Sequence, residues 1–531
     1  MNKHCYRIIF NRCLQRLVVV SELARRAGGT SRAGQPGQRL SIATLRPLTF
    51  ALLLAGGALS ASAQAGGIIA DPGAPRGQQP TVQQTGNGLP QVDIRAPNSQ
   101  GLSHNTYRQF DVDERGAILN NSQHATPTQL AGQIAGNPWL AKGSAKVILN
   151  EVNSANPSQL RGFVEVAGHK ADVIIANPAG ISCSGCGFIN AGRNTLAAGR
   201  VRLENGQIAG YDVDRGRITI SGAGMNGTGQ DYTRLIARAV EVNGRVQAGD
   251  LKVTTGRNQT DADGNVIKVK ADDPAGRPTF ALDTAALAGM YANRITLVGT
   301  EQGVGVRNRG EIGAAQGHFT LDASGKLTNS GVVQATQNIA IHTVGVENQG
   351  QIAAAGNITV ASQGDITNAG QLRAQGDLQL SASGKLVSQS SSTLIAGRHG
   401  TLHANTIDNQ RGSAVGAGID SQGQATAPGQ LTLSADQQLR SHGTHLSRDQ
   451  VTIKGKTVDL SDSQTQAQQV VVNAQEGDLH LDRAQLAAQQ ATLTTPGHLT
   501  NRQGKLVAQA LDLTAATRLD NQGGSIISQG P

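Results

Sequence analysis

The stretch NQGQIAAAGNITVASQGDITNAGQLRAQGDLQL (residues 348–380) decides the fold class of this chain. Its apolar residues alternate with polar ones at period 2, as in Ile358-Thr359-Val360, and Gly and Asn separate the short runs. An apolar stripe at the 3.6-residue period of a helix is absent from this stretch. Alternation bounded by turn residues predicts short β-strands joined by tight corners.

The same pattern returns about every 20 residues, which is a solenoid signature. Asn-x-Gly triplets recur at intervals of 21, 19 and 20 residues, beginning at Asn308, Asn329, Asn348 and Asn368. An apolar residue follows each of them, at Ile312, Val332, Ile352 and Leu372. The spacing returns at Asn501 and Asn521, 20 residues apart.

A single coil of such strands cannot bury its inward Val, Ile and Leu side chains, but stacked coils share one continuous aliphatic core. Inward Asn side chains at the corners can bond the coils above and below. The 2% aromatic content fits a narrow aliphatic core. We therefore expect an all-β chain that forms a right-handed parallel β-helix. The open end of such a solenoid exposes strand edges, so the N-terminal domain must cap it.

The net charge of +9 is concentrated in the first 65 residues. They hold nine of the 46 Lys and Arg but one of the 37 Asp and Glu, so the remainder carries 37 against 36, a net of +1. A strongly basic surface would favour nucleic acid or acidic membranes as partners. Because the remainder is almost neutral, we expect no nucleic-acid partner.

Residues 1–65 are organised as an export signal. An apolar run that begins with Leu48, Phe50, Leu52, Leu53 and Leu54 is closed by Ala61-Ser62-Ala63-Gln64-Ala65, where Ala63 and Ala65 are candidate cleavage sites. A membrane-spanning helix needs about 20 apolar residues, and this run has about a dozen. The basic region ahead of it resembles the extended signal peptides of autotransporters and two-partner exoproteins of Gram-negative bacteria. We expect secretion through the periplasm to the cell surface.

The rest of the chain divides by composition. Runs such as 147–149 and 173–175 predict strands, whereas Leu130 and Ile134, four residues apart, predict a short helix over 126–134. The polar stretch 257–273 predicts a loop or boundary. We therefore separate an N-terminal domain (66–258), a connecting segment (259–290) and repeats (291–531). The repeats continue almost to the last residue, so we expect a fragment or truncation of a longer protein.

Several motifs carry a family resemblance. They are NGLPQVDI (87–94), YRQFDV (107–112), NPWL (137–140), NPSQLRG (156–162) and NPAGI (177–181). On these motifs, residues 85–258 resemble the two-partner secretion domain of filamentous haemagglutinins, haemolysins and contact-dependent inhibition proteins. The resemblance implies that the domain binds the periplasmic domains of an outer-membrane transporter through extended-strand contacts.

Two of these motifs are the candidate recognition residues. Asn137-Pro138-Trp139-Leu140 stands where the family has Asn-Pro-Asn-Leu, and Asn177-Pro178-Ala179-Gly180-Ile181 where it has Asn-Pro-Asn-Gly-Ile. Ala179 in place of the usual Asn removes any role for that amide. Asn beside Pro also forms turns by bonding its own backbone, so the same residues can serve as coil corners. For the individual residues we favour the structural role.

Cys183 and Cys186 are the cysteines that remain after the signal. In an exported protein, a pair at this spacing most simply forms a small disulfide loop. Idle thiols, a redox site or a metal site are the alternatives. A redox site would need a helix at the first Cys, and a zinc site would need two further ligands, of which His169 alone is near in sequence.

No catalytic constellation is apparent in the sequence. Residues 222–227 spell G-x-G-x-x-G, but a dinucleotide site also needs a helix after the glycines and an acid about 20 residues on. The 12 His residues are scattered singly, without a zinc-protease or serine-hydrolase motif. We expect no enzymatic activity, no metal and no cofactor.

Three functions remain in view. The chain could form a shaft for adhesion to host or neighbouring bacterial cells, through an unknown receptor. It could instead be the delivery scaffold of a contact-dependent growth inhibition toxin whose C-terminal toxin domain is missing. A β-helical polysaccharide lyase is the enzyme alternative, but it would need clustered Asp and aromatic sugar platforms. The single Trp argues against the lyase.

Overall fold

A computed structural model describes residues 6–11, 16–21 and 67–530, which fall into two units. In the first unit, β1 (Tyr6–Asn11) and β2 (Arg16–Ser21) pair as an antiparallel hairpin. The apolar run over 48–54 and the cleavage candidates Ala63 and Ala65 lie outside the described residues. In the described part of the chain, no helix has the length and apolar character needed to cross a membrane.

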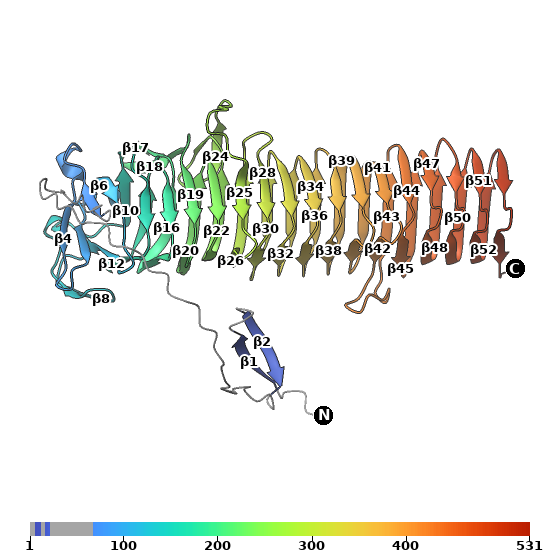
Figure 1. Ribbon diagram of the computed structural model, residues 1–531, viewed down its shortest axis with the longest axis horizontal. Helices are drawn as coiled ribbons and strands as arrows, with labels where there is room; N and C mark the ends of the chain where they lie inside the picture. Colours follow the sequence, from blue (N-terminus) through green and yellow to red (C-terminus); the bar gives the residue numbers. More distant parts are fainter. Residues whose placement is uncertain (1–5, 12–15, 22–66, 531) are drawn as a thin grey trace, which may run out of the picture. The chain divides into compact units, whose positions relative to one another are not determined.

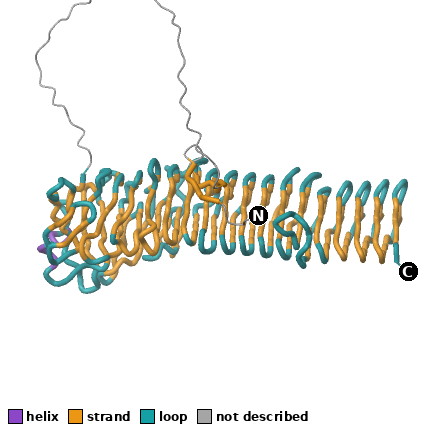
Figure 2. The backbone as a smooth tube through the Cα atoms, turned by 90° about the horizontal axis from the view of Figure 1, so that it is seen from below, coloured by secondary structure: helices purple, strands orange, loops and turns teal. Residues whose placement is uncertain are grey.

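The second unit is a parallel β-solenoid, whose stacked coils are seen side-on in Figure 1 and from below in Figure 2. Its strands form three parallel ladders, and the longest strands contribute to two of them. Ladder A contains β6 (Leu102–Phe110), β10 (Val147–Val152), β13 (Ala171–Ala176), β16 (Ala191–Ala197), β20 (Met225–Ala237), β22 (Arg245–Thr255), β27 (Arg294–Gly299), β30 (Phe319–Ala323), β33 (Ile339–Thr343), β36 (Ile358–Ser362), β39 (Leu378–Ser388), β41 (Gly400–Asn409), β43 (Gln430–Ala435), β46 (Gln450–Gly455), β48 (Gln464–Ala474), β50 (Gln485–Thr495) and β52 (Lys505–Ala515).

Ladders B and C complete each coil. Ladder B contains β11 (Ser158–Leu160), β14 (Ile181–Cys183), β19 (Arg217–Ile220), β21 (Ala239–Val242), β25 (Phe280–Thr284), β28 (Gly305–Asn308), β31 (Lys326–Asn329), β34 (Gly345–Asn348), β37 (Ile366–Asn368), β39, β41, β44 (Gln438–Ser441), β47 (Thr457–Asp459), β49 (Leu479–His480), β51 (His498–Thr500) and β53 (Arg518–Asp520). Ladder C contains β5 (Pro90–Asp93), β7 (Ala117–Asn121), β12 (Phe163–Gly168), β15 (Cys186–Ile189), β20, β22, β26 (Gly289–Ala292), β29 (Glu311–Ala314), β32 (Val332–Ala335), β35 (Gln351–Ala354), β38 (Gln371–Ala374), β40 (Thr393–Ala396), β42 (Ala414–Ala417), β45 (Thr444–Ser447), β48, β50, β52 and β54 (Ser525–Ser528).

The core is a set of aliphatic columns that run through the coils. In ladder A one column contains Leu321, Ile341, Val360, Leu380 and Leu402, each in register with the next and at most 1% exposed. Every inward side chain thus packs against the coil above and the coil below, as a solenoid requires. The expected all-β parallel solenoid is confirmed.

The N-terminal end of the solenoid departs from the parallel pattern. There β3 (Ile68–Ala70) pairs antiparallel with β6, and β4 (Thr81–Gln84) pairs antiparallel with β5. These segments lie at the first coils together with the short helices η1 (Arg76–Gln78) and η2 (Pro138–Leu140), and Figure 2 shows helix at this end of the solenoid. Antiparallel pairing over the first coils removes part of the free strand edge that a bare solenoid would expose.

The helix predicted over 126–134 is wrong. Residues there form the antiparallel hairpin β8 (Thr126–Thr128) and β9 (Gly132–Ile134). The Glu165 carboxylate accepts the amides of Gln129 and Leu130 at 2.7 and 2.9 Å, so the turn is satisfied by a side chain from a later coil. Leu130 and Ile134 instead pack onto one small apolar cluster.

The polar stretch 257–273 contributes strands to a second, antiparallel sheet outside the solenoid. This sheet has the order β17 (Arg200–Glu204), β18 (Gln207–Asp212), β23 (Asn258–Thr260) and β24 (Val266–Val269). Its apolar side chains, among them Tyr211 and Ile208, pack on outward residues of ladder A such as Ile174 and Ile236. The solenoid ladders continue beneath it from β22 to β26 and β27, and the proposed boundaries at 258 and 290 stay a prediction.

One ionisable group lies inside the core of the later coils. His445 on β45 is fully buried between the hydroxyls of Ser441 and Thr465. Burial lowers the pKa of His445 from 6.5 to about 4 because the charged imidazolium would lose its hydration.

We expect this histidine to make the later coils acid-sensitive. In the unfolded chain His445 binds a proton below pH 6.5, whereas the folded chain resists protonation down to about pH 4, so stability falls as pH decreases through this window. The expected loss at pH 5 is about 2 kcal/mol. Unfolding measured between pH 7 and 4 should show this slope, and His445→Val, which matches Val415 in the same column, should remove it. An unchanged slope in the variant would contradict the assignment.

Candidate functional site

The first motif forms a turn at the N-terminal end of the solenoid. Asn137 precedes η2 and is 3% exposed, and its side-chain oxygen accepts the amide of Trp139 at 2.9 Å. Its side-chain NH2 donates to the carbonyls of Ile94 and Asn120, both at 2.9 Å. Leu140 is fully buried in the core. Asn137 therefore ties three chain segments together and has no free polar atom to offer a partner.

Pro138 and Trp139 are the exposed members of this motif. Trp139, the larger of the two, is 41% exposed, and the Arg95 guanidinium lies 3.8 Å from the centroid of its ring. The indole N–H donates to the Thr81 hydroxyl at 3.1 Å. These contacts hold a large amphipathic ring in a fixed orientation at the surface. Aromatic rings of this kind are common in protein-binding surfaces. We call Thr81, Arg95 and Trp139 the Trp139 platform.

The second motif has the same internal geometry. Asn177 is fully buried and accepts the Ala179 amide at 2.9 Å, while its NH2 donates to the Asn156 carbonyl and the Ser158 hydroxyl of the previous coil. Gly180 has a φ of +119°, which favours glycine. Pro178 lies in the turn and Ile181 enters the core at 3% exposed. Ala179 supplies its backbone amide alone, so the turn does not use the side chain that the family has there.

Cys183 and Cys186 follow this turn and lie in the solenoid core. Cys183 ends β14 and Cys186 begins β15, with Gly185 at a φ of +92° between them. The two residues are joined by a disulfide, and their Cα atoms are 5.4 Å apart. They are 0% and 2% exposed. The bond closes the corner that connects ladders B and C in this coil.

We expect the exported protein to carry this disulfide. Intact-mass measurement with a thiol-reactive label should find no free thiol, and two labelled cysteines would contradict the expectation. Closing so short a loop removes chain entropy worth about 2 kcal/mol in the unfolded state. Cys183→Ala/Cys186→Ala should therefore lower the denaturation midpoint. A matched control is the wild-type protein after reduction, which should lose the same amount.

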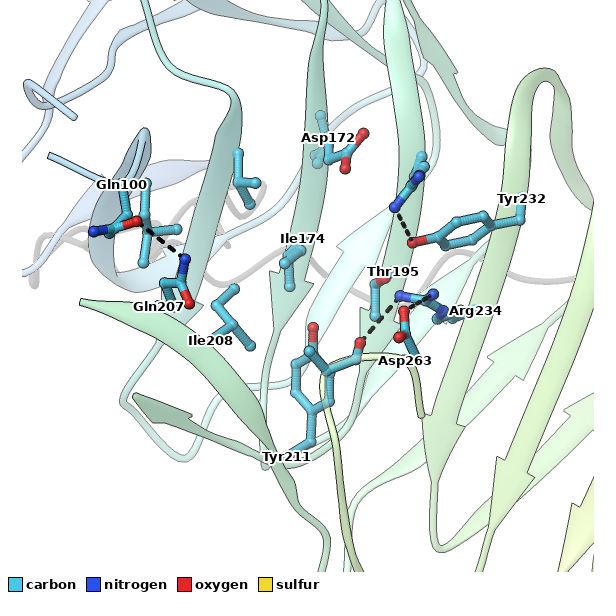
Figure 3. A pocket seen from close by; sticks show the side chains of 15 residues that line it. Gln100, Asp172, Ile174, Thr195, Gln207, Ile208, Tyr211, Tyr232, Arg234 and Asp263 are labelled. Carbon is cyan, nitrogen blue, oxygen red and sulfur yellow. Dashed lines mark hydrogen bonds and ion pairs between the residues drawn. The ribbon is translucent and has the colours of Figure 1, made fainter. Parts of the chain in front are cut away.

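The second sheet encloses a pocket of about 260 Å³ against the outward face of ladder A. In Figure 3, Ile174 and Ile208 lie on one side of the pocket and Tyr232 and Arg234 on the other. Tyr211, 1% exposed, forms its base. The sequence gives no signal for this pocket, because five successive strands of ladder A (β6, β10, β13, β16 and β20) build it together with β18 and the turn between β23 and β24.

A buried ion pair fastens the loop around residues 270–277 to the solenoid. Arg238, fully buried between β20 and β21, donates to the Glu301 carboxylate at 3.2 and 2.7 Å. It also donates to the backbone carbonyls of Asp273 and Ala275 at 2.6 and 3.0 Å. The hydrogen bond to the Glu301 carboxylate raises the pKa of Arg238. The sequence contains no local signal for this pair, since the partners are 63 residues apart.

The G-x-G-x-x-G segment does not have the surroundings of a dinucleotide site. Its last three residues, 225–227, already belong to β20, so a strand stands where such a site needs a helix. Among residues 67–530, no three His, Cys, Asp or Glu side chains gather in a way that could hold a metal ion.

Comparison with protein families accounts for most of the chain. Residues 1–51 match the extended signal peptide of the type V secretion system, and residues 66–329 match the TPS secretion domain. Four overlapping matches to the haemagglutinin repeat follow, at 314–370, 333–390, 373–428 and 426–523. The chain belongs to the two-partner secretion exoproteins. It is thus a secreted protein that passes through the periplasm and across the outer membrane of Gram-negative bacteria.

Two curated relatives illustrate this membership. Toxin CdiA of Yersinia pestis is 47% identical over 94% of this chain, and tRNA nuclease CdiA-2 of Burkholderia pseudomallei (strain 1026b) is 43% identical over 62%. The chain spans 15% and 11% of the length of these relatives. Among solved structures, the filamentous hemagglutinin secretion domain is 31% identical, covering 61% of this chain and 100% of that one, with a TM-score of 0.48.

The family and the fold are those of secretion and adhesin scaffolds. The TPS secretion domain indicates that the exoprotein interacts with a two-partner transporter. Neither finding assigns a role to individual residues of the two Asn-Pro motifs.

Proposed function

We propose that residues 66–329 are recognised by the periplasmic domains of a cognate outer-membrane transporter, and that the later coils form a shaft for adhesion to cells. The match of these residues to the TPS secretion domain carries the first part. The uninterrupted ladders from β27 to β54 support the second, because they make one elongated body with a continuous core. We propose no enzymatic activity for residues 66–531.

Export is the test of the first part. With its signal and the cognate transporter, the fragment ending at residue 329 should reach the culture medium, and without the transporter it should remain in the periplasm. A fragment ending at residue 300 would lose Glu301 and leave Arg238 buried without its partner. We therefore expect the shorter fragment to be exported less efficiently. Periplasmic retention of the longer fragment in the presence of the transporter would contradict the proposal.

Within this domain we propose the Trp139 platform as a contact with the transporter. The asparagines of the two motifs are buried and internally bonded, whereas Trp139 presents an oriented ring. Trp139→Ala should weaken binding to the purified periplasmic domains by about tenfold or more, as loss of an anchoring aromatic does. Leu519→Ala, a 47% exposed residue near the far end of the described coils, is the control. Unchanged binding with a native circular dichroism spectrum would exclude the platform.

A second candidate function is supported by the relatives. The curated relatives are named as toxins and nucleases, and this chain corresponds to 15% or less of their length. The chain would then be the scaffold that delivers a C-terminal toxin to neighbouring bacteria. Growth of target cells mixed with producing cells distinguishes the two: adhesion without inhibition favours the adhesin, and inhibition that requires sequence beyond residue 531 favours the delivery scaffold.

A further inference from the structure

The pocket beneath the second sheet has a divided lining. One part is apolar and contains Leu102, Val147, Ile174 and Ile208, which come from ladder A and from β18. The other part contains the ionisable side chains Asp172, Arg193, Tyr232, Arg234 and Asp263. A hydrogen bond of 3.1 Å between Gln207 and Gln100 closes the pocket at its apolar part. A lining of this kind fits a molecule with one apolar and one charged portion.

Most charged groups in the lining are already engaged with each other. Arg234 lies 3.9 Å from the Tyr232 ring centroid, donates to the Ala262 carbonyl at 3.0 Å and pairs with Asp263. Arg193 donates through one terminal nitrogen to the Tyr232 hydroxyl at 3.2 Å. Its remaining donors have no protein acceptor in the described chain.

Asp172 is the carboxylate of the lining that these contacts do not involve. It is half-buried beside Arg193 on the neighbouring strand, yet in the part of the chain that the structure describes its carboxylate forms no ion pair. Burial raises the pKa of Asp172, because the loss of hydration outweighs the attraction of Arg193 and Arg234 and the hydrogen bond from the Arg193 backbone amide. A carboxylate without an ion-pair partner and a guanidinium with unused donors therefore line the same cavity, next to an apolar wall.

We propose that this pocket binds a zwitterionic ligand of the apolar α-amino acid class. The ligand ammonium would bond Asp172, its carboxylate would bond Arg193, and its side chain would pack on Leu102, Val147 and Ile208. Charge-assisted hydrogen bonds at both ends would select a molecule that carries both charges. The cavity of about 260 Å³ has room for a molecule of this size. This site is independent of transporter recognition.

Leucine is the probe, and calorimetry on the full secreted chain is the measurement. We expect leucine to bind, and we expect the amine-free analogue 4-methylpentanoate, the carboxylate-free analogue 3-methylbutylamine and the side-chain-free analogue glycine to bind at least tenfold more weakly. Asp172→Asn and Arg193→Gln should each weaken leucine binding by about 10- to 100-fold, the effect expected when a hydrogen bond to a charged group is lost. Asp512→Asn and Arg440→Gln, exposed on the shaft, are the matched controls.

Several outcomes would overturn the proposal. No binding of leucine, equal binding of the analogues, or leucine binding that survives both pocket substitutions would each do so. If the folded pocket variants bind the transporter more weakly while leucine binds neither wild type nor variant, the pocket is a protein contact and the ligand proposal is wrong. Native circular dichroism spectra of the two variants separate these outcomes from misfolding.

Discussion

Arg238→Met should lower the free energy of unfolding of the coils around β20–β27 by about 3–5 kcal/mol. The substitution keeps an unbranched apolar stem but removes the guanidinium, which leaves the 6% exposed Glu301 carboxylate without a cation. It also frees the carbonyls of Asp273 and Ala275, which lose their donors. Hydrogen exchange of amides in β20, β22 and β27 is the measurement, because a solenoid opens locally.

The structure provides a matched control for this effect. Arg307 makes the same two-bond contact with Asp283, at 2.9 and 2.7 Å, but the two side chains are 32% and 20% exposed. Arg307→Met should therefore cost less than about 1 kcal/mol, as surface ion pairs do. Arg238→Met/Glu301→Leu should recover much of the loss, since it removes the unpaired charge. Equal losses of unfolding free energy in the two single variants would show that burial of the Arg238–Glu301 pair does not increase its contribution to stability.

The expected dependence on pH has a definite sign. In Arg238→Met the buried Glu301 carboxylate has lost its counter-charge, so its burial disfavours the charged form. Protonation removes the unfavourable charge, so the defect should shrink as the pH decreases. A defect that stays constant from pH 7 to 4 would indicate lost packing instead of an unpaired carboxylate.

The sequence predicts the repeated coils better than the features attached to them. Period-2 triplets such as Ile358-Thr359-Val360 and the 20-residue spacing predict a solenoid because each coil solves the same packing problem. By contrast, Arg238 and Glu301 lie 63 residues apart and meet only after two coils have closed. The helix prediction for 126–134 fails for a similar reason, since amides of this turn donate to Glu165 from a later coil.

The candidate site shows the same division. The family motifs drew attention to Asn137 and Asn177, and the structure shows both as buried turn residues with all their bonds internal. The sequence could not show which residues beside these two asparagines would be exposed. Trp139 is a surface candidate because the structure leaves its ring exposed beneath the Arg95 guanidinium. The pocket beneath the second sheet depends on how β17, β18, β23 and β24 fold back onto ladder A, which no periodic pattern encodes.

The asparagine ladder predicted from the Asn-x-Gly spacing is confirmed. Each side-chain NH2 donates to the next side-chain oxygen at 2.8 Å, along Asn308, Asn329, Asn348 and Asn368. All four side chains are at most 1% exposed. Because these amides have no access to water, each depends on its neighbours in the adjacent coils for its hydrogen bonds.

Asn348→Ala should destabilise the coils on both sides by about 2–4 kcal/mol. The change removes the acceptor of Asn329 and the donor of Asn368, and it leaves a cavity in a packed corner. Asn338→Ala is the control, because Asn338 is exposed and its side chain accepts one amide, that of Asn357. Faster hydrogen exchange in β31, β34 and β37 for Asn348→Ala alone is the expected result, and equal exchange in the two variants would contradict it.

The asparagine ladder has a gap, so the contribution of its hydrogen bonds can also be tested by adding an asparagine. Ser388 occupies the position after Asn368, its hydroxyl has no partner, and the side-chain oxygen of Asn409 in the following coil is also unbonded. Ser388→Asn would accept from Asn368 and donate to Asn409, so it should stabilise these coils by about 1 kcal/mol. Slower exchange in β37, β39 and β41 would show that the ladder itself stabilises the shaft. Faster exchange would show that the corner at residue 388 has no room for the amide, and that serine is required there by volume.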